Sequence, residues 1–443
     1  MKIQLSDHFT YKKLIRFVLP SIFMMIVTSI YSVVDGLFIS NFVGKTPFAA
    51  INLIIPFTMV LGGMGFMFGT GGTAIVSRIV GEGDRERANR VFSMIIISSV
   101  LVGAVLIALG EIYMRPVAIL LGASDDMLEY CVVYGRIIVA FTPMFMLQNI
   151  FQSFLAAAEK PKLGLIVTTV AGCTNIVLDA LFIAIFKWGV VGAAIATGIG
   201  QLLGGVIPLV YFLGKNDSLL RLTKTKLELR PILRACGNGS SELLTNIASS
   251  LVGMLYNFQL MKYLGEDGVS AFGVLMYVQF IFIAIEIGYS IGSAPIVGYN
   301  FGAKNQKELE NIYKKSIISM STTGAVLFAL AELLAIPLAK LFVGYDEHLF
   351  NLTIHAFRIF SFAFITSGIN IFSSGFFTAL NNGLVSAIIS FMRSIVFQVI
   401  FIFLLPFIFG VDGIWLAVLA TEICAFAVSV LFLFFNRKKY GYA

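Results

Sequence analysis

Long apolar segments alternate with short polar loops along almost the whole chain. Each segment has about 20 to 30 residues, which at 1.5 Å of helix rise per residue is enough to cross a hydrocarbon core of roughly 30 Å. Twelve such segments can be marked, and they predict an all-α integral membrane protein. The segments are 14–41, 48–77, 91–114, 131–156, 163–186, 189–213, 235–262, 269–298, 315–340, 350–379, 384–409 and 412–435.

The composition agrees with this pattern and excludes a soluble enzyme. Of the 443 residues, 58% are hydrophobic and only 12% are charged, whereas an ordinary soluble domain has about 25% charged residues. Cys131, Cys173, Cys236 and Cys424 stand singly in or beside apolar segments, and the three histidines are scattered. These positions argue against a disulfide scaffold and against a zinc site. We therefore expect no cofactor and no catalytic activity.

Basic residues gather at both termini and in alternate loops, and this distribution predicts the orientation. The basic stretches are 2–16, 78–90, 160–162, 215–234, 304–315 and 437–439. The loops between them carry acids, such as Asp125, Asp126 and Glu266. Short loops rich in Lys and Arg stay in the cytoplasm, so we expect a multi-pass protein of the plasma membrane with both termini cytoplasmic.

The net charge of +7 is explained by this topology. A nucleic-acid partner would need basic patches interleaved with aromatic side chains, and the sequence has none. We expect membrane lipids and small molecules as partners, and a monomer.

The second half of the chain repeats the first with an offset of 221 residues. The matching positions include Gly44 and Gly265, Gly81 and Gly302, Glu111 and Glu332, and the segments GVVGAAIA from Gly189 and GVDGIWLA from Gly410. Six helices per half is an even number, so both halves enter the membrane from the same side and a pseudo-twofold axis along the membrane normal relates them. We predict an N-lobe at 1–214, a basic cytoplasmic linker at 215–234 and a C-lobe at 235–443.

Two acidic residues lie deep in the N-lobe and have no counterpart in the C-lobe. A charged side chain inside a span costs several kcal/mol unless it is paired, hydrated or protonated. Counted from the outer loop ends, Asp35, Asp179 and Thr197 lie roughly 12 Å below the outer surface, and Asn175 is one helical turn from Asp179. Oxygen ligands of this kind predict a Na⁺ site or a proton site. Alternatively, the cluster only joins three helices by hydrogen bonds.

Further candidates are weaker. Glu286 and Glu422 are deep in the C-lobe, where they either neutralise a cationic substrate or pair with Arg393 or polar neighbours. Pro20 removes one backbone hydrogen bond below Asp35, which favours bending of the first helix. Apart from Na⁺ at the Asp35 cluster, we expect no metal site.

Four motifs together resemble the multidrug and toxic compound extrusion (MATE) family, within the branch of DinF-like and MepA-like proteins. They are IYSVVDGLFISNFVG in the first helix, VSRIVGEGDRERA after the second, its echo VGYNFGAKN after the eighth, and GVVGAAIAT opening the sixth. The resemblance covers essentially the whole chain. It implies two six-helix lobes that rock against each other and export organic, often cationic, compounds in exchange for Na⁺ or protons.

The resemblance also carries site residues onto this sequence. It implies a cation site formed by Asp35, Asn175, Asp179, the backbone near Ala193, and Thr197, and a first helix that bends at a proline, here Pro20. Another branch of the family uses acids in helices 7 and 10. Helix 10 of this sequence has none, and Glu242 of helix 7 lies too near the helix end, so a C-lobe ion site is not expected.

Two other classes of function remain as alternatives. A flippase of lipid-linked saccharides, from the same broad superfamily, should have more than twelve spans or a cavity with several Arg and Lys. A membrane-embedded enzyme would need a nucleophile with a base or a metal cluster, and no histidine accompanies the carboxylates. A channel or receptor suits the asymmetric acids less well. The sequence does not decide between Na⁺ and protons.

Overall fold

The computed structural model describes residues 3–443, and this part of the chain is helical almost throughout. Two short π-helical segments, η1 and η2, continue α6 and α12. The elements are α1 (Tyr11–Phe42), α2 (Lys45–Gly81), α3 (Arg85–Leu120), α4 (Asp125–Ala140), α5 (Thr142–Ala157), α6 (Pro161–Asp179), η1 (Ala180–Ile185), α7 (Gly189–Leu213), α8 (Leu229–Gly302), α9 (Gln306–Val343), α10 (Glu347–Ser361), α11 (Phe364–Ala379), α12 (Gly383–Phe391), η2 (Met392–Val396), α13 (Phe397–Phe409) and α14 (Val411–Tyr440).

These elements make twelve crossings of a membrane. Within the described residues, nine helices are long and apolar enough to span one, and two bent helix pairs, α4 with α5 (57°) and α10 with α11 (48°), add one crossing each. The 74 residues of α8 reverse direction at Gly265, where φ is 63° and ψ is −148°, so α8 supplies two crossings. The predicted fold class is confirmed.

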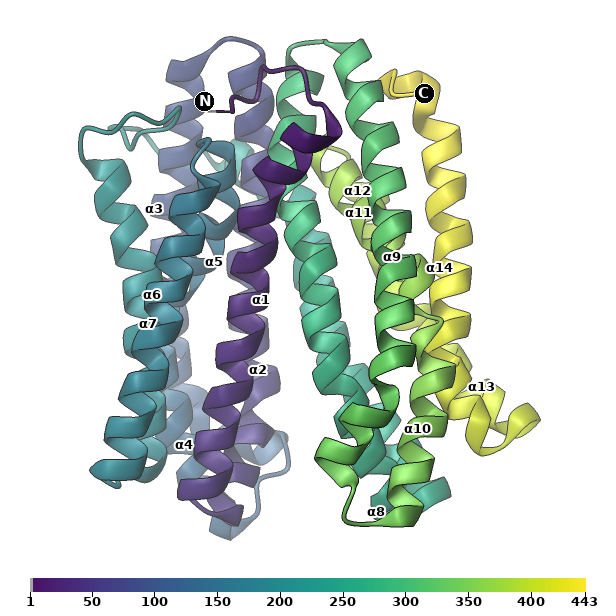
Figure 1. Cartoon of the computed structure of the whole chain (residues 1–443). Coiled ribbons are helices and arrows are strands. Elements are labelled where there is room, and N and C mark those ends of the chain that lie inside the picture. Colours follow the sequence, from purple (N-terminus) through teal and green to yellow (C-terminus); the bar gives the residue numbers. More distant parts are fainter. Residues whose placement is uncertain (1–2) are drawn as a thin grey trace.

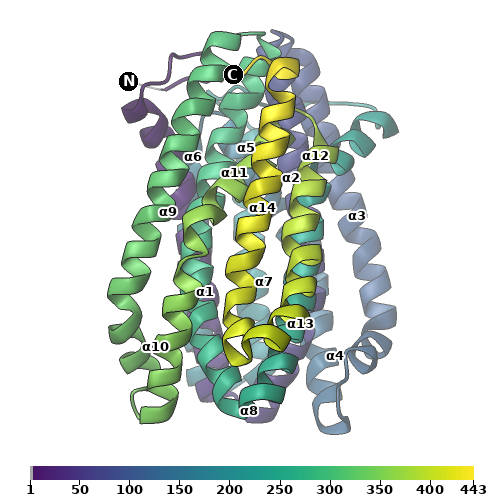
Figure 2. The same cartoon turned by 90° about the vertical axis from the view of Figure 1, so that its right-hand side faces the viewer.

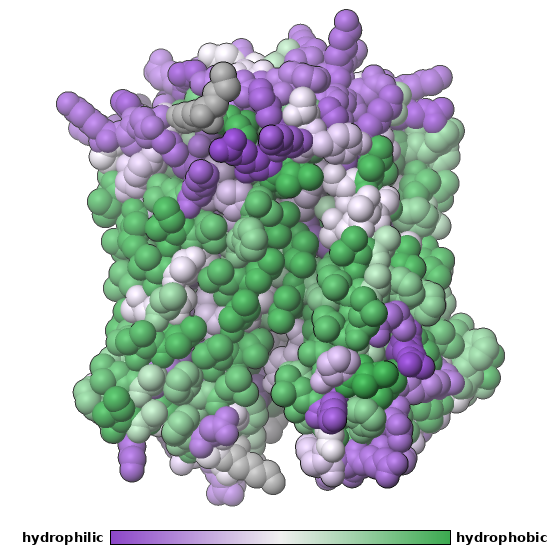
Figure 3. Space-filling model, viewed as in Figure 1, coloured by the Kyte–Doolittle hydropathy of each residue, from purple (hydrophilic) through white to green (hydrophobic). Residues whose placement is uncertain are grey.

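The helices form two bundles with a common orientation. Elements α1 to α7 make the N-lobe and α8 to α14 the C-lobe, and both termini lie at the same end of the molecule (Figure 1, Figure 2). Hydrophilic side chains cover that end, and a broad hydrophobic belt lies below them (Figure 3). We call the end that carries the termini and the basic stretches the basic face.

The repeat is visible in the backbone as well as in the sequence. Gly44 and Gly265, which are 221 residues apart, both have positive φ (111° and 63°), and so do Gly189 and Gly410 (56° and 58°). Left-handed φ values are open to glycine at no steric cost. Each lobe therefore turns its chain at the same two places on the face opposite the basic one.

Several helices begin earlier on the basic face than hydrophobicity predicts. Helix α3 begins at Arg85 rather than at 91, and α9 begins at Gln306 rather than at 315. Asp84 and Asn305, again 221 residues apart, cap these helices by accepting from the backbone N–H of Arg87 (2.9 Å) and of Glu308 (3.2 Å). Capped turns outside the membrane are polar, so a hydrophobic segment does not include them.

The linker between the lobes is shorter than predicted and is held against the N-lobe. Because α8 begins at Leu229, residues 214–228 form the covalent link between the last helix of the N-lobe and the first of the C-lobe. Within them Asp217 accepts from Lys160 Nζ at 2.6 Å, and this hydrogen bond lowers the pKa of Asp217. The backbone N–H of Arg221 donates to Asn89 Oδ1 at 2.9 Å.

Near the basic face the two lobes touch backbone to backbone. A Cβ added at Gly81 of α2 would lie 2.1 Å from the carbonyl oxygen of Tyr299, and one added at Gly302 of α8 would lie 2.0 Å from that of Arg78. Each contact is the pseudo-symmetric copy of the other. Only a residue without a side chain permits helices to approach this closely.

A second close contact of this kind lies deeper, between α2 and the first half of α8. A Cβ at Gly71 of α2 would be 2.0 Å from the carbonyl oxygen of Ala235, and one at Gly239 of α8 would be 2.0 Å from that of Met67. At the other end of the molecule the lobes are parted by a cleft (Figure 3). The structure is thus closed at the basic face and open at the opposite face.

The segment before α1 braces the closed end. Glu308 at the start of α9 accepts from the backbone N–H of Phe9 at 2.8 Å and contacts His8 Nδ1 at 2.6 Å. The backbone N–H of Leu5 donates at 2.8 Å to Glu159, which lies in the N-lobe. Leu5 and Phe9 are buried. Residues 3–10 therefore connect the C-lobe to the N-lobe on the basic face.

Candidate functional site

Four of the predicted site residues meet inside the N-lobe. Helix α1 carries Asp35, the last turns of α6 carry Asn175 and Asp179, and α7 carries Thr197. Asp179 is 0% exposed and Asn175 is 3% exposed. The carboxyl groups of Asp35 and Asp179 lie close enough to interact. We call these four residues the N-lobe cluster.

Most polar atoms of the N-lobe cluster are buried and lack a conventional hydrogen-bond partner. Within residues 3–443, no partner is found for Asp35 Oδ1, either carboxylate oxygen of Asp179, the Asn175 amide or Thr197 Oγ1. Leaving such groups unsatisfied is costly, and hard cations prefer oxygen ligands of this kind. The arrangement suits a monovalent cation or a proton.

Local helix geometry positions the cluster. Directly after Asp179 the chain continues as the π-helix η1, a widened turn that is frequent at functional sites. A Cβ at Gly200 of α7 would lie 3.3 Å from Asn175 Cβ, so this glycine lets α7 approach α6 closely. Ala193, which the resemblance adds to the site, is fully buried in α7, one turn before Thr197.

Two tyrosines belong to the site and were missed by sequence reasoning. Tyr134 of α4 is 6% exposed and lies within electrostatic reach of Asp35 and Asp179 and beside Thr197. Tyr31 lies one turn before Asp35 on α1, close to that carboxylate. A phenol donates a hydrogen bond that a carboxylate accepts. The spacing of four residues could have identified Tyr31, whereas nothing local distinguishes Tyr134.

Pro20 lies buried in α1, and the helix runs through it without a break from Tyr11 to Phe42. The described conformation therefore has no interruption there. Bending at Pro20 stays a prediction.

Glu286 and Glu422 belong to a separate buried cluster in the C-lobe. Arg393 of η2 binds Glu422 through Nη2 (2.7 Å) and Nε (2.8 Å), and Asn370 donates to the same carboxylate at 2.7 Å. Ser367 donates to Glu286 Oε1 at 2.7 Å, and Glu286 is within electrostatic reach of Arg393. Of the two roles open to Glu422, the geometry favours the ion pair with Arg393.

Removing the cation of this pair is expected to destabilise the C-lobe strongly. Arg393→Met leaves Glu422, which is buried, without its counter-charge, and breaking a buried pair costs about 3–5 kcal/mol. Arg393→Met with Glu422→Gln should regain most of the loss, because no unpaired charge is left. Denaturant unfolding of the purified protein measures both. If the single variant unfolds at the wild-type midpoint, the pair does not stabilise the lobe.

Two pseudo-symmetric lobes with a buried polar cluster near mid-depth define a membrane transporter rather than an enzyme. A family model described as MatE matches residues 20–181 and 243–404, one segment in each lobe. These segments cover more than half of the chain, and the chain therefore belongs to the MATE family. Proteins of this family are transporters.

Relatives and solved structures match nearly end to end. Multidrug export protein MepA of Staphylococcus haemolyticus is 27% identical over 434 residues, covering 96% of this chain and 94% of its own. MepA of Staphylococcus aureus strain MRSA252 is 25% identical over 430 residues, 95% and 93% of the two chains.

The structural matches concern the fold. An outward-facing multidrug resistance MATE family transporter of the MOP superfamily has a TM-score of 0.93 at 22% identity, covering 100% and 99% of the two chains. A MATE in complex with MaL6 has a TM-score of 0.92 at 22% identity, covering 98% of each chain. The twelve-helix, two-lobe fold is the one these transporters share.

Proposed function

We propose that this protein exports drug-like, often cationic, compounds from the cell in exchange for Na⁺ or protons. The N-lobe cluster carries the proposal, since the buried, unpartnered carboxylate oxygens of Asp35 and Asp179 suit a small cation. The relatives named as multidrug export proteins support the choice of substrate class. The basic face is cytoplasmic in this proposal, by the distribution of Lys and Arg.

The proposed cycle uses the two ends of the molecule in turn. With the basic face closed by the glycine crossings, a cation enters through the open cleft and binds between Asp35 and Asp179. Binding offsets the repulsion between the two carboxylates and draws α1, which carries Asp35, toward α6. The lobes then rock, because a ligand shifts a conformational equilibrium by its difference in affinity for the two states. The flippase alternative needs buried cations to hold a pyrophosphate, and Glu422 already engages Arg393.

Efflux from proteoliposomes tests the proposal. Vesicles loaded with a fluorescent organic cation receive a Na⁺ gradient or a pH gradient, one at a time, and efflux is followed by fluorescence. One gradient at least should drive efflux from vesicles with protein and not from protein-free vesicles. Folded protein that responds to neither gradient would refute ion-driven export.

A further inference from the structure

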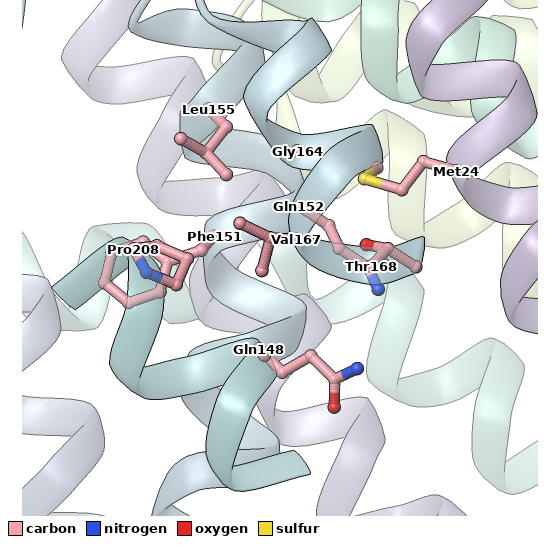
Figure 4. A pocket seen from close by; sticks show the side chains of 10 residues that line it. Met24, Gln148, Phe151, Gln152, Leu155, Gly164, Val167, Thr168 and Pro208 are labelled. Atoms are coloured by element: carbon pink, nitrogen blue, oxygen red, sulfur yellow. The ribbon is translucent and has the colours of Figure 1, made fainter. Parts of the chain in front are cut away.

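We infer that a hydrated polar passage inside the N-lobe connects the N-lobe cluster to the basic face and releases the coupling ion there, apart from the substrate cleft. The inference rests on the proposed function. Its starting point is a cavity of about 10 Å³, room for about one water molecule, between α1, α5, α6 and α7 (Figure 4). The lining residues that matter are Met24, Gln148, Gln152, Thr168, Gly204 and Pro208.

Hydrogen-bond acceptors without donors line this cavity. Gln148 and Gln152 are each 4% exposed, and the carbonyl oxygen of each side chain lacks a partner within the described chain. Pro208 has no N–H, so the carbonyl of Gly204, four residues earlier in α7, has no helical donor. A buried acceptor left unsatisfied costs about 1–3 kcal/mol. Water supplies the missing donors, and a cavity with several polar partners is where buried water binds.

Tyr31 connects the cavity to the N-lobe cluster. It lies beside Asp35 on one side and beside Gln148 on the other. Two glycines make room for this connection: a Cβ at Gly172 would be 2.7 Å from the Tyr31 ring, and one at Gly204 would be 2.7 Å from the Gln148 side chain. Gln152 follows Gln148 by one turn on the same face of α5. Polar side chains thus lead from the carboxylates into the cavity.

The other end of the cavity approaches the basic face. Leu155 and Gly164, which flank the loop between α5 and α6, are part of its lining. Met24 packs onto Gly164, with its sulfur 3.3 Å from a Cβ added there. The passage therefore ends under apolar side chains close to the loop that holds Lys160. Its size suits a water molecule, whereas drug-sized molecules need roughly 300 Å³ or more.

Radiolytic footprinting tests hydration without depending on transport. Hydroxyl radicals formed from bound water oxidise neighbouring methionines. Met24 is only 2% exposed, yet we expect its oxidation in the purified wild-type protein to be about tenfold faster than that of Met114 and Met320, buried to the same degree (0% and 1%) in apolar surroundings. Gln152→Leu should slow the oxidation of Met24. Oxidation of Met24 at the rate of Met114 would overturn the inference.

Transport by matched variants tests whether the ion uses the passage. Gln148→Leu and Gln152→Leu should slow ion-driven efflux by about tenfold, which corresponds to about 1.4 kcal/mol on the barrier. Gln201→Leu is the control, because Gln201 is also buried (8%) with an unpartnered carbonyl oxygen but does not line the cavity. Equal rates for all three variants contradict the inference, provided that wild-type protein responds to an ion gradient. A wild type that responds to none contradicts the proposed function instead, and Met24 footprinting still decides on hydration.

Discussion

Asp179→Asn is expected to reduce ion-driven efflux to the rate of protein-free vesicles while the protein stays folded. Asp179 is fully buried and neither carboxylate oxygen has a partner within residues 3–443, so its charge is available to a bound cation. Asparagine keeps the size of the side chain and removes that charge. Because an unpaired buried charge is costly, the variant should also be at least as stable as the wild type. Efflux and denaturant unfolding measure the two effects.

Asp35→Asn should behave in the same way, and Asp126→Asn, an exposed acid on the face opposite the basic one, is the control that should transport normally. Full coupled transport by both Asp35→Asn and Asp179→Asn would remove the N-lobe cluster from the mechanism.

Two further variants distinguish coupling to Na⁺ from coupling to protons. Asn175→Leu and Thr197→Val delete neutral oxygen ligands that Na⁺ needs and a proton does not, so they should abolish Na⁺-driven efflux and spare proton-driven efflux.

Gly239→Ala is expected to prevent full closure of the basic face. Its Cβ would lie 2.0 Å from the Met67 carbonyl oxygen and 2.9 Å from the Gly71 nitrogen, and these are backbone atoms that no rotamer change can move away. Overpacking of this kind costs about 1–3 kcal/mol, which changes a two-state equilibrium by about 5–150-fold. The population should shift away from the closed end, and pulsed electron spin resonance between labels on the basic face measures that shift.

Gly237→Ala is the matched control for this variant. Gly237 lies two residues away on the same helix, and a Cβ there meets nothing within 4 Å, so the change in helix propensity is the same and the clash is absent. Labels at the exposed positions Arg87 and Lys307 lie on α3 and α9, one in each lobe. Gly239→Ala should add longer distances, and Gly237→Ala should match the wild type. Identical distributions for all three proteins would mean that the glycine crossing does not limit closure.

The membrane spans of this fold are predictable from the sequence. Of the breaks that divide single spans into two helices, only some have a signal in the sequence. Hydrophobicity marks 189–213, which are the bounds of α7, because that helix is apolar from end to end. The break between α4 and α5 has a signal in Pro143, which occupies the first turn of α5 and favours a helix start. The break between α10 and α11, around Phe362, has neither proline nor glycine and arises from tertiary packing.

In the candidate site, too, some residues are predictable from the sequence and others are identified only by tertiary packing. Counting residues from the loop ends places Asp35, Asp179 and Thr197 at one depth, because helices rise regularly, and the structure brings them together. Tyr134 could not be found in that way, since the apolar segment at 131–156 places it at the outer end of its span, whereas α4 already begins at Asp125. Gln148 and Gln152 are polar residues in an apolar span, and this marks them as candidate functional residues in the sequence. Only the structure shows that both line one cavity between four helices.

The brace formed by residues 3–10 bears on the order in which the protein is made. Phe9 leaves the ribosome well before its hydrogen-bond partner Glu308, which follows 299 positions later. At about 5–20 residues per second, the delay is on the order of 15–60 s. Residues 3–10 therefore wait, undocked, until α1 to α8 have been synthesised, and closure of the basic face is a late step in the assembly of this transporter.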